Sequence, residues 1–159
     1  RYQEEKRGIP AAAFDWVARL RARKLQPFVQ AHHIVFEFGV GWGWNLAALQ
    51  CRRRLGYDVA EFLRPVLSQR QIEVVGDLAE IPDGSVDVVL CHHTLEHVAQ
   101  PVDTVARLAQ LLTGEGRLVV CAPFEKERRY RHFWREEPNH HLSSVVDRLS
   151  SRPNVPIRQ

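Results

Sequence analysis

The sequence lacks several features that mark other classes of protein. It has no methionine, only three cysteines, and no apolar run near the roughly 20 residues that a membrane-spanning helix needs. The cysteines are odd in number and far apart, so we expect reduced, buried thiols in a cytoplasmic protein rather than a disulfide framework. No signal peptide is recognisable. The absence of methionine leads us to expect that either terminal residues or modified methionine positions are missing from the sequence.

What is present is typical of one globular domain. Hydrophobic residues make up 45% of the 159 residues, which is enough for one core, and 26% charged residues with ordinary aromatic content exclude a fibrous or disordered chain. A net charge of +3 is weak support for a polyanionic partner. We therefore expect a single domain over residues 1–159, without internal repeats or a linker.

Short β-rich runs alternate with segments of helical periodicity. Strands are expected at 34–38, 57–59, 72–76, 86–91 and 117–123. Helices are expected between them at 45–55, 60–70 and 95–112. This alternation predicts an α/β fold: a doubly wound, mainly parallel, Rossmann-like sheet of about five strands with helices on both faces.

An amphipathic helix is expected before the sheet, at residues 10–26. Pro10 opens it, and Phe14, Val17 and Leu20 alternate with arginines and a lysine. We expect this helix to pack on the surface of the core; the alternative is a lid over a substrate.

A glycine cluster follows the first expected strand. Gly39, Gly41 and Gly43 form a G-x-G-x-G pattern, which allows a tight turn and lets a ligand approach the backbone. The helix start at Trp44 and Asn45 would present unpaired N–H groups to an anion. Because dinucleotide folds use G-x-G-x-x-G, a nicotinamide or flavin cofactor fits this spacing less well.

Two carboxylates flank this turn. Glu37 lies in the first strand, and Asp58 ends the second about 20 residues on, where open α/β folds bind ribose hydroxyls. Both would repel a pyrophosphate, whereas they suit a cofactor with an amino group, a sulfonium and a ribose. Taken singly, the glycines could form an ordinary turn, and Asp58 and Asp77 could cap helices. Their occurrence together at successive strand ends favours a ligand site.

Four stretches carry a resemblance to a known family. VFEFGVGWGWNL, GYDVAEF, VVGDLAEIPDGSVDVVLCHHTLEHV and GEGRLVVCAPFE resemble the class I S-adenosylmethionine-dependent methyltransferases, in particular the small-molecule group with an LEHV-type segment after strand four. The resemblance covers a core at roughly 34–125 and implies S-adenosylmethionine as cofactor. It also implies that Glu37 and the glycine backbone up to Asn45 hold the methionine part.

The same resemblance assigns the remaining cofactor contacts to later strand ends. Asp58 would bind the ribose hydroxyls, and Val59 would lie along the adenine. Asp77 would accept a hydrogen bond from the adenine amino group, and Leu78 would add its backbone N–H and an apolar face. His92 would border the methionine part and the transferred methyl group.

The segment CHHTLEHV also contains His93-x-x-Glu96-His97, the H-x-x-E-H signature of inverted zinc peptidases. A zinc hydrolase needs both histidines on one helix face and a third ligand, and no clear ligand helix follows, so we expect no metal. Glu96 and His97 are expected to fix the first turn of a helix. His92 and His93 would then face the cleft, where either removes a proton from the acceptor or only shapes the pocket.

The acceptor side is expected in a basic loop at 124–141, after strand five. Cations are interleaved there with aromatic rings, at Lys126, Arg128, Arg129, Tyr130, Arg131, His132, Phe133, Trp134 and Arg135. Such a loop suits an anionic or ring-bearing acceptor, although local Glu–Arg pairs on a solvated surface fit equally well. No Asn-Pro-Pro-Tyr-like tetrad follows strand four, so a nucleic acid is not the expected acceptor. We expect a small-molecule or lipid-linked one.

The sequence departs from the family after strand five. The antiparallel hairpin that normally completes the sheet is missing or incomplete, and a bare edge at strand five would favour a homodimer. The main hypothesis is methyl transfer to an acceptor whose reacting atom is not specified. The rival is a truncated or degenerate methyltransferase-like module that binds the cofactor without turnover.

Overall fold

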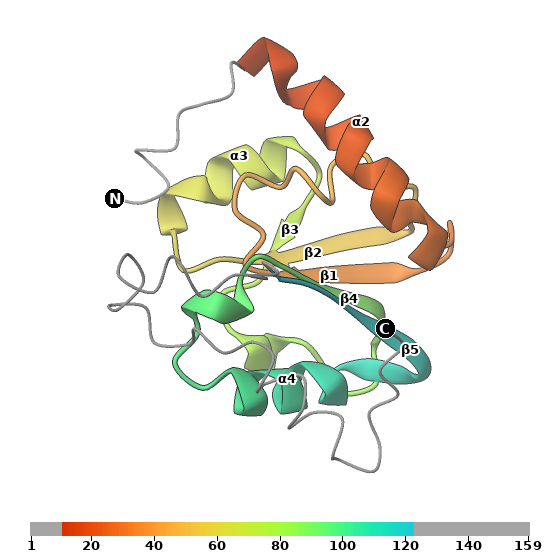
Figure 1. Ribbon diagram of the computed structural model, residues 1–159, viewed down its shortest axis with the longest axis vertical. Helices are drawn as coiled ribbons and strands as arrows, with labels where there is room; N and C mark the ends of the chain where they lie inside the picture. The colour runs from red at the N-terminus through yellow and green to blue at the C-terminus, as the bar shows by residue number, and fades with distance from the viewer. Residues whose placement is uncertain (1–10, 123–159) are drawn as a thin grey trace, which may run out of the picture.

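Five parallel strands form the centre of the fold, with helices on both faces (Figure 1). The computed structural model describes residues 11–122. The strands are arranged β3-β2-β1-β4-β5, and they comprise β1 (Ile34–Phe38), β2 (Arg53–Tyr57), β3 (Glu73–Val74), β4 (Val86–His92) and β5 (Leu112–Cys121). β1 pairs with both β2 and β4, so the chain order reverses there. The predicted doubly wound parallel sheet is confirmed.

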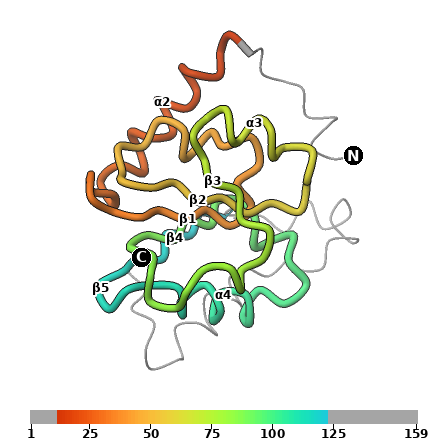
Figure 2. The backbone as a smooth tube through the Cα atoms, turned by 180° about the vertical axis from the view of Figure 1, so that it is seen from behind, coloured from red at the N-terminus to blue at the C-terminus, as the bar shows by residue number. Residues whose placement is uncertain are grey.

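The two faces of the sheet carry separate parts of the core. Alternate side chains of a strand point to opposite faces, so Val35 packs with α2 (Phe14–Leu25) and α3 (Arg64–Gln69), while Phe36 packs with α4 (Pro101–Gln110). The view from behind shows the same layers, with α2 and α3 on one side of the sheet and α4 on the other (Figure 2). The alternation also places Glu37 on the face that α2 covers.

α2 covers the upper face through small side chains. It follows η1 (Ala11–Ala13) and precedes η2 (Gln26–Phe28), and its buried residues are Ala18, Ala22 and Leu25. Leu20, expected on the apolar face, is 45% exposed. The small alanines allow the helix to pack closely against Leu46 and Leu49, and Arg21 of this helix reaches Asn45 beside the glycine turn.

The helix expected at 45–55 is wrong. Residues 44–48 form turns, and β2 already begins at Arg53 instead of residue 57. Arg54 donates from Nε to the carbonyl of Leu46 at 3.1 Å and from Nη2 to that of Leu49 at 2.6 Å. These carbonyls therefore bond to a side chain, and no helical ladder continues. Gly56 lies in β2, where an added Cβ would approach the Cγ atoms of Val40 at 3.0 Å, so the close packing there favours glycine.

The later helices are shorter than expected. The segment 60–70 divides into η3 (Glu61–Leu63) and α3, and the segment 95–112 into η5 (Leu95–His97) and α4. β5 starts at Leu112, five residues before the expected strand, and includes Gly114 and Gly116. A register irregularity opposite β4, between Val86 and Val88, accommodates these extra residues.

Several expectations fall outside residues 11–122. They concern the basic loop at 124–141 and the C-terminal hairpin. The pairing of a second chain at the edge of β5 stays a prediction. Within the part that the structure describes, no helix is both long and apolar enough to cross a bilayer.

Candidate cofactor site

The glycine turn lies at the carboxyl end of β1 and packs between Thr94, which follows β4, and Ile72, which precedes β3. Gly39, Gly41 and Gly43 have φ values of 77°, 51° and 77°, a region that side chains disfavour. A Cβ on Gly39 would overlap the side chain of Thr94, and one on Gly43 would fall 2.6 Å from Cδ1 of Ile72. The turn is therefore glycine-dependent in both conformation and space.

Asp58 connects the end of β2 to this turn. Its Oδ2 accepts a hydrogen bond from the backbone N–H of Gly41 at 2.8 Å, and its Oδ1 accepts from that of Ala60 at 2.9 Å. Each carboxylate oxygen has a second lone pair, so Asp58 retains the capacity to accept from hydroxyl groups. The structure thus brings Asp58 against the glycine turn, and its role as a ribose partner stays a prediction.

Glu37 is a buried carboxyl group at the base of the site, with only 1% of its surface exposed. Its Oε1 accepts a hydrogen bond from Nδ2 of Asn45, while its Oε2 has no hydrogen-bond partner. Burial raises the pKa of Glu37 to about 8; the Asn45 hydrogen bond and the charge of Arg21 lower it, and Asp58 raises it further. An unpaired buried carboxyl oxygen fits the ammonium group of a methionine moiety.

Asn45 also receives a contact that the sequence did not predict. Nη1 of Arg21, from α2, donates to Oδ1 of Asn45 at 3.2 Å, and the guanidinium carbon lies 5.1 Å from the ring centre of Trp44. The sequence offers no signal that separates Arg21 from the neighbouring Arg19 and Arg23. Only the docking of α2 shows which arginine reaches the site.

A second arginine fixes the opposite side of the turn. Nη1 of Arg70, at the end of α3, donates to the carbonyl of Trp42 at 2.7 Å. Its guanidinium lies 3.5 Å from the ring centre of Phe14 in α2, and Phe14 contacts Trp44 with ring centres 6.4 Å apart. The turn is thereby held by residues from both helices of the upper face.

The residues expected to contact the adenine lie at the ends of β2 and β3. Val59 has 83% of its surface exposed, which leaves an apolar side chain open to a flat ring. Asp77 is exposed and caps η4 (Leu78–Glu80), because its Oδ1 accepts from the N–H of Ala79 at 2.8 Å. Asp77 could cap η4 and contact an adenine at the same time, because its Oδ2 stays available to accept a hydrogen bond.

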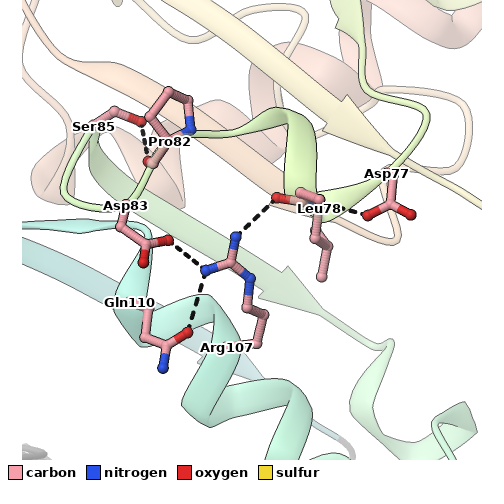
Figure 3. A network of polar contacts seen from close by, with 8 residues as sticks. Asp77, Leu78, Pro82, Asp83, Ser85, Arg107 and Gln110 are labelled. Atoms are coloured by element: carbon pink, nitrogen blue, oxygen red, sulfur yellow. Dashed lines mark hydrogen bonds and ion pairs between the residues drawn. The ribbon is translucent and has the colours of Figure 1, made fainter.

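Arg107, from α4, holds this loop and was not predicted. Figure 3 shows its guanidinium among Leu78, Asp83 and Gln110. Nη2 donates to the carbonyl of Leu78 at 3.1 Å, and Nη1 contacts Asp83 and Gln110. No pattern in the sequence pairs an arginine of a later helix with this loop. Arg107 nevertheless fixes the backbone next to Asp77.

His92 and His93 lie at the end of β4. Their rings pack edge to face with centres 4.6 Å apart. Burial, with smaller contributions from His93 and Arg21, lowers the pKa of His92 to about 4, so this imidazole is neutral near physiological pH. Thr94 donates from Oγ1 to the carbonyl of His92 at 3.2 Å and abuts Gly39, which joins the histidine segment to the glycine turn.

The zinc motif adopts a different geometry from that of a zinc peptidase. His93 has a left-handed φ of 53° and precedes η5, so His93 and His97 do not share a helix face. Nδ1 of His93 lies 3.4 Å from Oε1 of Glu96. Over residues 11–122, the structure has no group of three or more side chains arranged to hold a metal ion.

The chain is similar to known methyltransferases in sequence. Residues 36–120 match the family described as Methyltransferase domain. A probable S-adenosylmethionine-dependent methyltransferase of Mycobacterium tuberculosis H37Rv is 34% identical over 90 residues, covering 54% of this chain and 33% of that protein. The chain thus spans about a third of the length of that relative.

Solved structures show the same fold at low sequence identity. A SAM-dependent methyltransferase from Archaeoglobus fulgidus aligns with a TM-score of 0.67 at 18% identity, covering 96% of this chain and 73% of that one. The YcgJ protein from Bacillus subtilis aligns with a TM-score of 0.56 at 20% identity, covering 67% and 50%. Together with the family match and the strand order, these likenesses show that the chain belongs to the methyltransferase domain family and has the class I, Rossmann-like fold.

Proposed function

We propose that the protein is an S-adenosylmethionine-dependent methyltransferase that acts on a small-molecule or lipid-linked acceptor. The observation that carries this proposal is the buried Glu37, whose unpaired Oε2 lies at the base of a glycine turn that Asp58 also contacts. A carboxyl group left unpaired in a core lowers stability, so its retention is best explained by a cationic ligand.

In this proposal, each residue at a strand end binds a different part of the cofactor. Glu37 would accept from the ammonium group of the methionine part, beside the backbone of the glycine turn. Asp58 would accept from the ribose hydroxyls, and the exposed Val59 would cover the adenine. Asp77 and the backbone of Leu78, fixed by Arg107, would meet the edge of the adenine.

The cofactor supplies a sulfonium-bound methyl group that an acceptor attacks in line. The contribution of this chain is to hold the two reactants in position and keep water away. His92 remains neutral near physiological pH and would border the methyl group without adding a positive charge. His93, whose Nδ1 faces Glu96, is the better placed of the two to take a proton from an acceptor through its Nε2.

The compartment proposed for this activity is the cytoplasm. Cys51, Cys91 and Cys121 are free thiols in the structure. Free cysteines suit a reducing environment, because an oxidising one favours disulfides.

Calorimetric titration with S-adenosylmethionine and S-adenosylhomocysteine tests the cofactor assignment. Asp58→Asn removes the charge of the ribose partner and should weaken binding by about 1–3 kcal/mol. The matched control is Asp103→Asn, an exposed acidic residue of α4, which should bind like the wild type. No binding of either ligand by folded wild-type protein would refute the proposal.

A second measurement separates the enzyme from its non-catalytic rival. Radiolabelled methyl transfer would be followed with a panel of small phenols, amines, carboxylic acids and phospholipid-linked acceptors. Transfer to one class supports the enzyme and names the acceptor. Tight cofactor binding without transfer to any member would favour the binding module.

A further inference from the structure

Arg21 is a half-buried cation at the centre of the site, and the proposed cofactor contacts leave it without a role. It reaches the site from α2 and makes two contacts, one with Oδ1 of Asn45 and one with the ring of Trp44. Over residues 11–122, no carboxylate forms an ion pair with it. Nη1 bonds to Asn45, so donors of the guanidinium fork remain for a ligand.

Asn45 connects this cation to the buried acid. Its Oδ1 accepts from Arg21, and its Nδ2 donates to Oε1 of Glu37, so one side-chain amide separates the guanidinium from the buried carboxyl group. Oε2 of Glu37 has no partner. The site therefore offers an unpaired acceptor for a cation beside unused donors for an anion.

The electrostatic influence of Arg21 extends across both central strands. Burial is the main cause of the altered pKa of Glu37 in β1 and of His92 in β4, and the charge of Arg21 acts to lower both pKa values. Arg21 therefore acts electrostatically on both residues that are expected to border the methionine part. A positive charge there favours a ligand that brings its own negative charge.

An α-amino acid carries an ammonium and a carboxylate on one carbon, which matches this pair of neighbouring groups. We propose that Arg21 binds the α-carboxylate of the methionine part, beside the ammonium held by Glu37, and so makes α2 a wall of the cofactor site. The inference rests on the proposed function and extends it, because it makes the carboxylate a determinant of selectivity. Binding of the cofactor would also link α2 to the sheet, because Arg21 of α2 and Glu37 of β1 would contact the same ligand.

The decisive comparison is between S-adenosylmethionine and decarboxylated S-adenosylmethionine, which differ at the group that Arg21 would bind. Calorimetric titration should show that the wild type binds the complete cofactor about tenfold to a hundredfold more tightly, as for one charge-assisted contact. Arg21→Gln should bind both ligands with similar affinity. The ratio is informative because both ligands keep the ammonium, so any effect of Arg21 on Glu37 cancels.

Two further variants control for charge and for folding. Arg23→Gln removes an exposed arginine from the same helix and should retain the wild-type ratio. Arg21→Lys keeps the charge without the planar fork and should retain part of the ratio. Circular dichroism and thermal unfolding confirm that α2 is intact in each variant.

Each outcome bears on the inference. A wild type that binds both ligands equally, or an Arg21→Gln variant that still discriminates as the wild type does, overturns it while leaving the proposed function in place. Failure of the folded wild type to bind S-adenosylmethionine at all removes the proposed function, and the inference with it. If Arg21→Gln does not fold, the wild-type ratio and the Arg21→Lys variant decide the matter.

Discussion

Replacing Glu37 by glutamine should stabilise the free protein while weakening its ligand site. Glu37 is almost completely buried, and burial is the largest cause of its raised pKa of about 8, against an ordinary value of 4.5. The unfolded chain loses this proton from about pH 4.5, whereas the folded protein holds it until about pH 8. The folded state therefore becomes less stable as pH rises between these values.

The size of the effect follows from the pKa difference. Each unit of pKa corresponds to about 1.4 kcal/mol, so ionisable Glu37 lowers the free energy of unfolding by about 3 kcal/mol near pH 7. Glutamine has a similar shape, can still accept from Asn45 and does not ionise. Glu37→Gln should match the wild type near pH 4 and exceed it by about 3 kcal/mol near pH 7.

Urea unfolding of both proteins between about pH 4 and pH 8 measures this difference. Glu115→Gln, at an exposed position in β5, is the control and should stay within about 0.5 kcal/mol of the wild type throughout. A Glu37→Gln variant that is less stable than the wild type near pH 7, or a difference that does not change with pH, would show that the buried carboxyl is not the source of strain.

Two further predictions concern the loops on either side of the site. Gly39→Ala and Gly84→Ala both place a side chain at positive φ, with φ values of 77° and 67°, but only Gly39 faces another side chain, that of Thr94. Denaturant unfolding should show a cost of about 1–2 kcal/mol for Gly84→Ala and about 1–3 kcal/mol more for Gly39→Ala; equal costs would contradict the close contact. The lowered pKa of His92, about 4, predicts in an NMR titration that its imidazole stays neutral until the pH falls well below 6.5, and that protonation then favours unfolding. Protonation of His92 near its ordinary pKa would contradict its desolvation at the end of β4.

The positions of the strands and of the acidic strand ends were largely predictable. β1 and β4 are short apolar runs bounded by turn residues, a local signal, and they lie close to their expected positions. Asp58 and Asp77 each follow a strand, so parallel pairing brings them to the same edge of the sheet. These features depend on residues near one another in the sequence, which is why pattern alone finds them.

The helix at 45–55 was predicted wrongly for a physical reason. Its apolar spacing is helical, but the carbonyl of Leu46 accepts from the N–H of Leu49 in a short turn, and the carbonyls of Leu46 and Leu49 both bond to the side chain of Arg54. Hydrogen bonds from the Arg54 side chain depend on how the chain folds back on itself, and the spacing of apolar residues contains no information about that. The same applies to β5, whose early start depends on its irregular pairing with β4.

The sequence by itself determined the alternation of strands and helices, the glycine turn, and the acids at the strand ends, because each is a local pattern. Only the tertiary structure decided that Arg21, and not a neighbouring arginine, reaches Asn45, and that Arg107 holds the backbone of Leu78. It also decided that one oxygen of Glu37 has no partner. These contacts join residues far apart in the chain, and docking of α2 and α4 against the sheet selects them through burial, which no local spacing encodes.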